Sequence, residues 1–174
     1  MKEIELHNAG EIAEYVELLQ HSADEAKLKI MDFSNNASGI MLLQKMKFDE
    51  FGFDPLNPAR PLNIIEQVNQ TFTYLASFKA AEMLFAWHQD LSCLKLNLGT
   101  AGGTDIEAAE CGGIAAEIFA ATRLSSNNKL NKDIEKVSKV KAKHKYVMFL
   151  CPAVPPGEYQ IKKQSIIKLW SLEH

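Results

Sequence analysis

Two carboxylates in the middle of the chain occupy positions where a carboxylate is costly. Glu117 interrupts the run 114–121, IAAEIFAA, whose other residues are all apolar. Asp105 precedes this run, in the segment Gly-Thr-Asp. Burying a lone carboxylate is strongly unfavourable unless it is paired, protonated or bound to metal. Two carboxylates that meet repel each other, whereas a hard divalent cation between them takes both as oxygen ligands. The pair therefore predicts a site for Mg²⁺ or Mn²⁺.

Neighbouring strands are needed to bring these two side chains together. Leucines alternate with polar residues over 94–98, glycines at 99–103 allow a reversal, and 104–109 predicts the second strand of a hairpin. The run 114–121 has the composition of a central strand. Alternation places Asp105 and Glu107 on one face of their strand, and Ala115, Glu117 and Phe119 on one face of theirs. We expect Asp105 and Glu117 to meet across the pair.

Helices are expected on both sides of this hairpin. Pro61 suits the first turn of a helix over about 62–87, whose apolar stripe comprises Ile65, Val68, Phe72, Leu75, Phe78 and Met83. A shorter helix is predicted over 9–20, after a capping pair formed by Asn8 and Glu11. Leu130, Ile134, Val137 and Val140 predict another helix, followed by a buried strand at 146–151. Three prolines make 51–61 an irregular connector, and 158–170 allows a strand or a helix.

Charge is distributed unevenly along the chain. Residues 1–122 contain 8 Lys or Arg against 18 Asp or Glu, whereas residues 123–171 contain 11 against 3. A basic C-terminal third is suited to nucleic acid, because clustered Lys and Arg release counterions from phosphates. The alternative is that Lys129, Lys132, Lys136 and Lys139 only form the solvated face of a helix.

Other residue patterns exclude several classes of protein. No apolar run is long enough to span a membrane and the N-terminus lacks a signal peptide, so a cytoplasmic protein without membrane contact is expected. The three cysteines (Cys93, Cys111 and Cys151) predict buried free thiols, and the histidines lack metal-site spacing. Residues 99–103 lack the ending of a P-loop. Trp87 and Trp170 either stack on bases or complete a core.

The order of these elements resembles the PD-(D/E)xK core of restriction-endonuclease-like nucleases. The resemblance covers about 62–152: long helix, hairpin, Gly-Thr-Asp105, the strand bearing Glu117, helix and strand. It implies that Asp105 and Glu117 are metal ligands. Phe119 stands at the position of the family's lysine, and some members take a catalytic residue from the following helix. The resemblance thus implies Lys129 as the charge stabiliser, with Lys132 as a second choice, and Glu66 as accessory metal ligand, with Glu82 as the alternative.

The expected fold is therefore an α/β domain with a restriction-endonuclease-like core, in which helices flank a central mixed sheet. One domain is expected over 1–171: an N-terminal helical extension and connector (1–60), the core (62–152) and a C-terminal strand or helix (153–171), with 172–174 as a tag remnant. The implied function is a Mg²⁺- or Mn²⁺-dependent DNA endonuclease, and a homodimer follows by analogy with that fold. The alternative is an inactive nuclease-like protein that binds nucleic acid or protein, with Glu117 in a salt bridge to a lysine such as Lys129.

Overall fold

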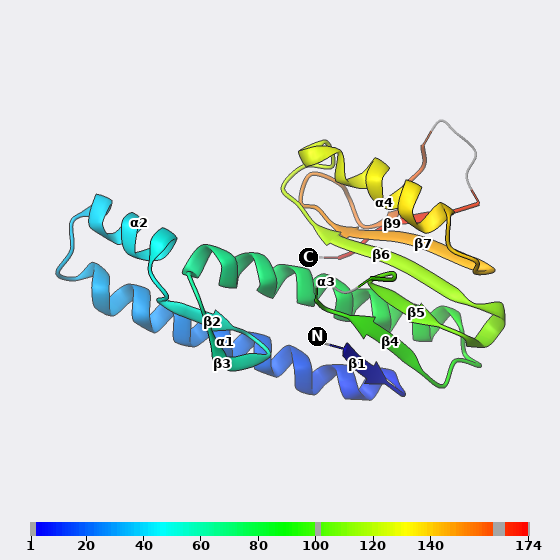
Figure 1. The fold of residues 1–174 in the computed structure, drawn as a ribbon, viewed down its shortest axis with the longest axis horizontal. Helices are drawn as coiled ribbons and strands as arrows, with labels where there is room; N and C mark the ends of the chain where they lie inside the picture. Colours follow the sequence, from blue (N-terminus) through cyan, green and yellow to red (C-terminus); the bar gives the residue numbers. More distant parts are fainter. Residues whose placement is uncertain (1–2, 100–101, 162–165, 174) are drawn as a thin grey trace. The chain divides into compact units, whose positions relative to one another are not determined.

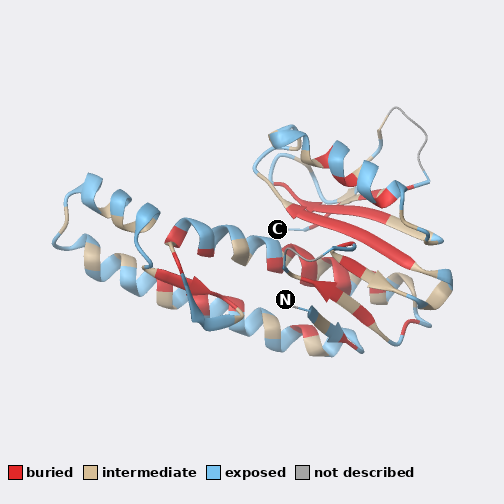
Figure 2. Cartoon of the chain, viewed as in Figure 1, coloured by how far each residue is buried: buried red, intermediate tan, exposed pale blue. Residues whose placement is uncertain are grey.

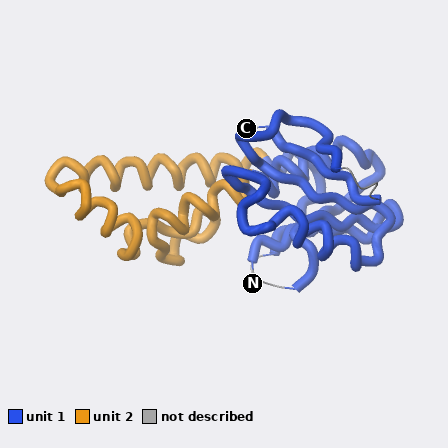
Figure 3. Tube along the Cα trace, turned by 90° about the horizontal axis from the view of Figure 1, so that it is seen from above, with its two compact units in different colours: residues 1–12, 76–174 blue, residues 13–75 orange. Residues whose placement is uncertain are grey.

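Contacts divide the chain into two compact units (Figure 3). The computed structural model describes residues 3–99, 102–161 and 166–173. Unit 1 contains residues 1–12 and 76–174, and unit 2 contains residues 13–75. The division falls inside one long helix, α3 (Ile64–Trp87), rather than at the expected boundary near residue 61. The single domain expected from chain length stays a prediction, since compactness does not measure cooperative unfolding.

Unit 1 is built on a mixed β-sheet (Figure 1). Within the described residues seven strands pair in the order β1-β4-β5-β6-β7-β9-β8. Their bounds are β1 (Glu3–Leu6), β4 (Leu94–Asn97), β5 (Ile106–Ala108), β6 (Ile114–Ala120), β7 (His144–Leu150), β8 (Gly157–Glu158) and β9 (Lys168–Ser171). The β6/β7 and β7/β9 pairs are parallel and the other pairs are antiparallel. A parallel pair needs a crossover, which α4 (Lys129–Ser138) provides between β6 and β7.

Helices cover both faces of this sheet. Leu130 and Val137 of α4 pack in one buried cluster with Phe119 and Phe149. On the opposite face the end of α3 brings Trp87 to 5.6 Å from the ring of Tyr146. β6 and β7 are therefore buried on both sides, as Figure 2 shows. The expected α/β class, a central mixed sheet flanked by helices, is confirmed.

Unit 2 combines three helical segments with a small hairpin. They are α1 (Ile12–Ser34), α2 (Gly39–Phe48), the first part of α3, and the strands β2 (Gly52–Asp54) and β3 (Asn57–Leu62). Gln67 joins them from a buried position. Its Nε2 donates to the Ser22 carbonyl and hydroxyl at 3.0 and 2.8 Å, and its Oε1 accepts from the Phe53 N–H at 3.2 Å. One satisfied polar side chain thus fixes α3 against α1 and β2.

The N-terminal elements differ from the sequence prediction in length. A 3₁₀ turn, η1 (Ala9–Glu11), is capped by Asn8 as expected, but the helix that follows continues to residue 34 rather than 20. The connector predicted at 51–61 is wrong, because β2 and β3 pair there. A two-stranded sheet has two edges, and edge positions tolerate proline. Pro61 consequently lies in β3, and α3 begins at residue 64, where Asn63 Oδ1 accepts from the Glu66 N–H at 2.8 Å.

Two more corrections concern burial and the chain end. Ile65, Val68 and Phe72, which belong to the apolar stripe predicted for α3, are exposed, whereas Phe78 of the same stripe is buried. Leu172, set aside with 172–174, belongs to the fold, since its side chain is fully buried and its N–H donates to the Phe149 carbonyl at 2.7 Å. The ambiguous segment 158–170 contributes the strands β8 and β9. His174 and part of the predicted turn at 99–103 (Thr100 and Ala101) lie outside the described residues. Within the described chain, no helix has the length and apolarity to span a membrane.

Candidate functional site

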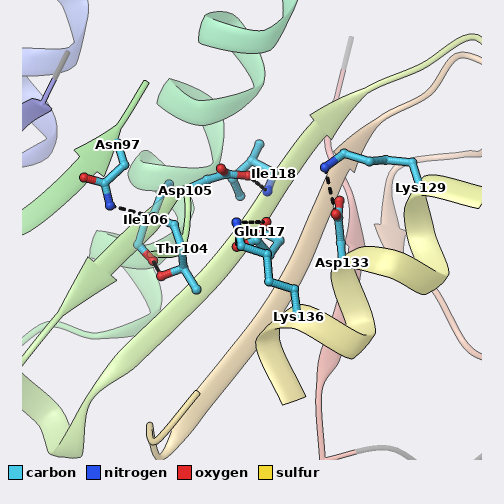
Figure 4. Close-up of polar contacts among 9 residues, drawn as sticks. All are labelled: Asn97, Thr104, Asp105, Ile106, Glu117, Ile118, Lys129, Asp133 and Lys136. Carbon is cyan, nitrogen blue, oxygen red and sulfur yellow. Dashed lines mark hydrogen bonds and ion pairs between the residues drawn. The ribbon is translucent and has the colours of Figure 1, made fainter. Parts of the chain in front are cut away.

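The register of β5 and β6 brings Asp105 and Glu117 together. Ile106 pairs with Ala116, so the next step of this antiparallel register sets Asp105 opposite Glu117, on the face covered by α4. The Asp105 carboxylate accepts a hydrogen bond from the Ile118 N–H at 2.7 Å, and its carbonyl accepts one from the Asn97 N–H at 2.8 Å. Both the side chain and the backbone of Asp105 are therefore held just before β5, and Figure 4 shows its carboxylate beside Ile118.

Glu117 forms an ion pair with Lys136 of α4. The Glu117 side chain is 1% exposed, and the Lys136 Nζ lies 2.8 Å from its Oε1 and 2.9 Å from its Oε2. Only the contact to Oε2 has hydrogen-bond geometry, which leaves Oε1 buried with a nearby charge but no directed donor. The salt bridge considered from sequence therefore exists, but Lys136 makes it rather than Lys129.

A third carboxylate, Asp133, completes the cluster. It is buried on α4, and the Lys129 Nζ lies 2.7 Å from its Oδ1. Its Oδ2 is buried and has no hydrogen-bond partner among the described residues. The site thus contains three carboxylates and two lysines, all from unit 1, so it carries one more negative than positive charge when all are ionised. Within the described residues no three His, Cys, Asp or Glu side chains have the arrangement of a metal centre.

Burial raises the pKa of each carboxylate in the cluster, and repulsion between carboxylates adds to the effect at Glu117 and Asp133. Desolvation, with the charges of Asp105 and Asp133, raises the pKa of Glu117 to about 7 despite the opposing effect of Lys136. Desolvation likewise raises the pKa values of Asp105 and Asp133. Burial alone would lower the pKa of Lys136, but its hydrogen bond and attraction to Glu117 raise it. The cluster therefore attracts additional positive charge, whether protons or a cation.

Phe119 belongs to the hydrophobic core rather than to the cluster. Its ring is 4% exposed and stacks on Phe149 with centroids 5.5 Å apart. A lysine with the backbone and neighbours of Phe119 would bury its charge among apolar side chains. The family's usual lysine position therefore has no polar role here, and the cations near the carboxylates come from α4.

The other predicted ligands lie elsewhere. Glu66 is exposed in the first turn of α3 and belongs to unit 2, and Glu82 is exposed farther along the same helix. Lys132 is exposed on α4. Of the side chains predicted for the site, the structure gathers Asp105, Glu117 and Lys129.

Sequence reasoning missed Asp133 and Lys136, although a signal for one of them was available. Leu130, Asp133 and Val137 have the spacing i, i+3, i+7 and are the buried residues of α4. An aspartate on a buried stripe needs the same explanation as Glu117. No comparable signal distinguished Lys136 from the other lysines of the same polar stretch of sequence. Its side chain stays 47% exposed even while it contacts Glu117.

A surface pocket of about 590 Å³ adjoins the cluster on the same face of the sheet. Glu107 and Ala115, paired across β5 and β6, are among the residues that line it. Alternation puts Asp105 two residues from Glu107 and Glu117 two residues from Ala115 on that face, but none of the three carboxylates of the cluster is among the residues that line the pocket. Lys95 and Lys141 also line it, so a ligand in the pocket would contact positive side chains as well as the negative Glu107.

The remaining residues considered from sequence have structural partners. Trp87 and Trp170 pack edge to face at 5.0 Å, and the Lys168 Nζ lies 4.0 Å from the Trp87 ring centroid. The His88 Nε2 is 2.7 Å from the Tyr146 hydroxyl. The three cysteines are free, as expected, but only Cys151 is buried.

Comparisons with known protein families, with curated proteins and with solved structures return no match to this chain. The function proposed below rests on the geometry of the carboxylate cluster.

Proposed function

We propose that this protein is a metal-dependent DNA endonuclease of the PD-(D/E)xK kind, whose catalytic lysine comes from the helix after the third core strand. The observation that carries the proposal is the meeting of Asp105 and Glu117 with the Lys136 Nζ, 2.8 Å from Glu117 Oε1. The observed order α3, β4, β5, β6, α4 and β7 supports it, because this is the order that the resemblance implies.

The donor set suits Mg²⁺ or Mn²⁺. Asp105 and Glu117 supply oxygen ligands, and the buried Oε1 of Glu117 lacks a directed donor. Burial raises the pKa values of Asp105 and Glu117, and the charge of Asp105 raises that of Glu117 further; a cation bound between them would offset the cost of both charges. When bound there, the ion would polarise a phosphodiester and lower the pKa of a water molecule.

Lys136 takes the role that the sequence prediction gave to Lys129. Its ammonium already lies at the carboxylates, and it stays protonated because their attraction raises its pKa. A fixed cation beside a phosphodiester stabilises the charge that develops on the phosphate oxygens during hydrolysis. Lys129 instead forms an ion pair with Asp133, with its Nζ 2.7 Å from Asp133 Oδ1, and so offsets the charge of the third carboxylate of the cluster.

Double-stranded DNA is the proposed substrate. Residues 123–171, which include α4, carry 11 Lys or Arg against 3 Asp or Glu. Such an excess supplies sequence-independent attraction to the phosphate backbone, which weakens steeply as salt increases.

Thermal unfolding with and without Mg²⁺ or Mn²⁺, together with plasmid nicking, tests the proposal. We expect the metal to raise the Tm of the native protein, since it binds only the folded site. Asp105→Asn and Glu117→Gln should abolish both this shift and nicking. Lys136→Met should keep a metal shift but lower the nicking rate by about 10²-fold or more, whereas Lys132→Met on the same helix should nick like the native protein.

An inactive nucleic-acid-binding protein is the second candidate, favoured by the Lys136 ion pair, which neutralises Glu117 without metal. In that case neither metal raises the Tm and no variant nicks, while binding of labelled DNA persists in a chelator. That outcome would discard the endonuclease proposal. Loss of DNA binding as well as nicking would discard both candidates.

A further inference from the structure

Unit 2 exposes an unusual amount of apolar surface. Of the twelve large apolar side chains that are exposed in the described part of the chain, eleven belong to this unit: Val16, Leu18, Leu28, Met31, Ile40, Met41, Leu43, Phe48, Ile65, Val68 and Phe72. Each exposes a third of its surface or more, and the seven on α2 and α3 together present roughly 700 Å². The largest apolar patch on a typical monomer is roughly 300–600 Å².

Helix α2 shows the polarity expected of a helix with something on its outer side. None of its residues is buried, and Phe48, Ile40 and Leu43 are 77%, 65% and 61% exposed. Its inner side carries the half-buried Leu42 and Met46 together with Lys45, whose Nζ lies 5.8 Å from the Phe33 ring centroid and 5.4 Å from that of Phe51. A surface helix normally turns its apolar side chains inward and its lysines to water. In α2 the outer side carries large apolar side chains as well.

The first turns of α3 repeat the pattern. Ile65, Val68 and Phe72 are spaced i, i+3, i+7 and form one exposed stripe. The inward side of the same turns is already occupied by the buried Ile64 and Gln67. The exposed stripe is therefore additional to the residues that stabilise the unit.

We infer that these apolar faces of α2 and α3 are the interface through which two copies of this chain associate. An apolar surface is self-complementary, as a two-fold symmetric interface requires. The seven exposed apolar side chains of α2 and α3 present roughly 700 Å², within the roughly 600–1,000 Å² per partner that a standard-size interface buries. A lipid surface fits less well, because unit 2 carries nine Asp or Glu against five Lys or Arg, and anionic headgroups attract an excess of cations.

Sedimentation equilibrium of the full chain tests the inference. We expect a species of twice the 19.5 kDa chain mass at micromolar concentration. Leu43→Glu and Phe48→Glu should weaken the association by about 100-fold or more, since each places a charge in an apolar contact. The matched control is Ile166→Glu, the same type of change at a residue 92% exposed in unit 1, and it should stay dimeric. Far-UV circular dichroism confirms that each variant is folded.

A second measurement needs no variant. The Tm of the native chain should rise with protein concentration, and the α2 amides should gain protection from hydrogen exchange over the same range. A chain that stays monomeric at every concentration up to about 100 μM overturns the inference. So does a dimer that Leu43→Glu and Phe48→Glu leave intact, or binding of the native chain to phosphatidylcholine vesicles through α2.

Discussion

At the scale of the residue, the burial of Glu117 is the feature of the candidate site that most affects stability, because it raises the pKa of this side chain to about 7. Glu117 lies in a strand that is otherwise apolar, one register step from Asp105, and a single lysine offsets its charge. Leaving such a group uncompensated is costly, and the cost varies with its protonation. The stability of the metal-free protein should therefore depend on pH through this residue.

We expect the unfolding free energy in a chelator to fall as pH rises from about 4.5 to about 7. The folded protein keeps the Glu117 proton up to a pKa of about 7, whereas the unfolded chain releases it near the ordinary value of 4.5. The folded state thus binds more protons in this window, and stability decreases with rising pH by up to about 3 kcal/mol. Urea unfolding at several pH values measures this slope.

Glu117→Gln should remove most of that slope, because glutamine does not titrate. The exposed Glu82→Gln on α3 is the control, and it should keep the native slope. An unchanged slope in Glu117→Gln would show that the charge of Glu117 is fully compensated in the folded state, by Lys136 or by solvent.

At the scale of the element, a side-chain cap determines where helix α3 begins. The sequence favoured Pro61 as the start, yet Asn63 is the residue whose side chain caps the helix. Local hydrogen bonding decides such boundaries, because the first N–H groups of a helix have no partner within it.

We therefore expect Asn63→Ala to cost about 1 kcal/mol of stability, the usual value of an N-cap. Chemical denaturation of the two proteins side by side measures the difference. Asn69→Ala, an exposed position inside the same helix, is the control and should be neutral or slightly stabilising, because alanine is the better helix former. Equal effects of the two changes would contradict a capping role.

At the scale of the molecule, the sheet of unit 1 has strands from the first and the last residues of the chain at its two sides. β1 pairs with β4 at one side, and β9 lies between β7 and β8 at the other. Leu172 directly follows β9, and its buried side chain belongs to the core.

Truncation should show this. Removing residues 172–174 is expected to cost about 2–3 kcal/mol, the value of one fully buried leucine with its hydrogen bond. Removing only 173 and 174 should change the stability by less than about 0.5 kcal/mol, since Glu173 is exposed. Thermal unfolding of the two truncated proteins makes the comparison, and an equal Tm for both would show that Leu172 contributes nothing.

The sequence by itself determined the central elements of unit 1 and one pair of the site, but not the strands β1, β8 and β9. Alternation and helical periodicity identified β4, β6, α4 and β7, since these patterns are set by which side of each element faces water. The misplaced carboxylates Asp105 and Glu117 were visible for the same reason. Because strand alternation also fixes the face, their meeting followed from a hairpin register.

Only the tertiary structure decided which partners those carboxylates acquire. Lys136 and Lys129 are equally lysines of a polar helix face, and the way α4 packs across β6 gives one to Glu117 and the other to Asp133. Packing also exposed the predicted stripe of Ile65, Val68 and Phe72 and buried Leu172. Such choices depend on contacts between residues far apart in the chain, and local periodicity carries no information about which apolar face finds a partner.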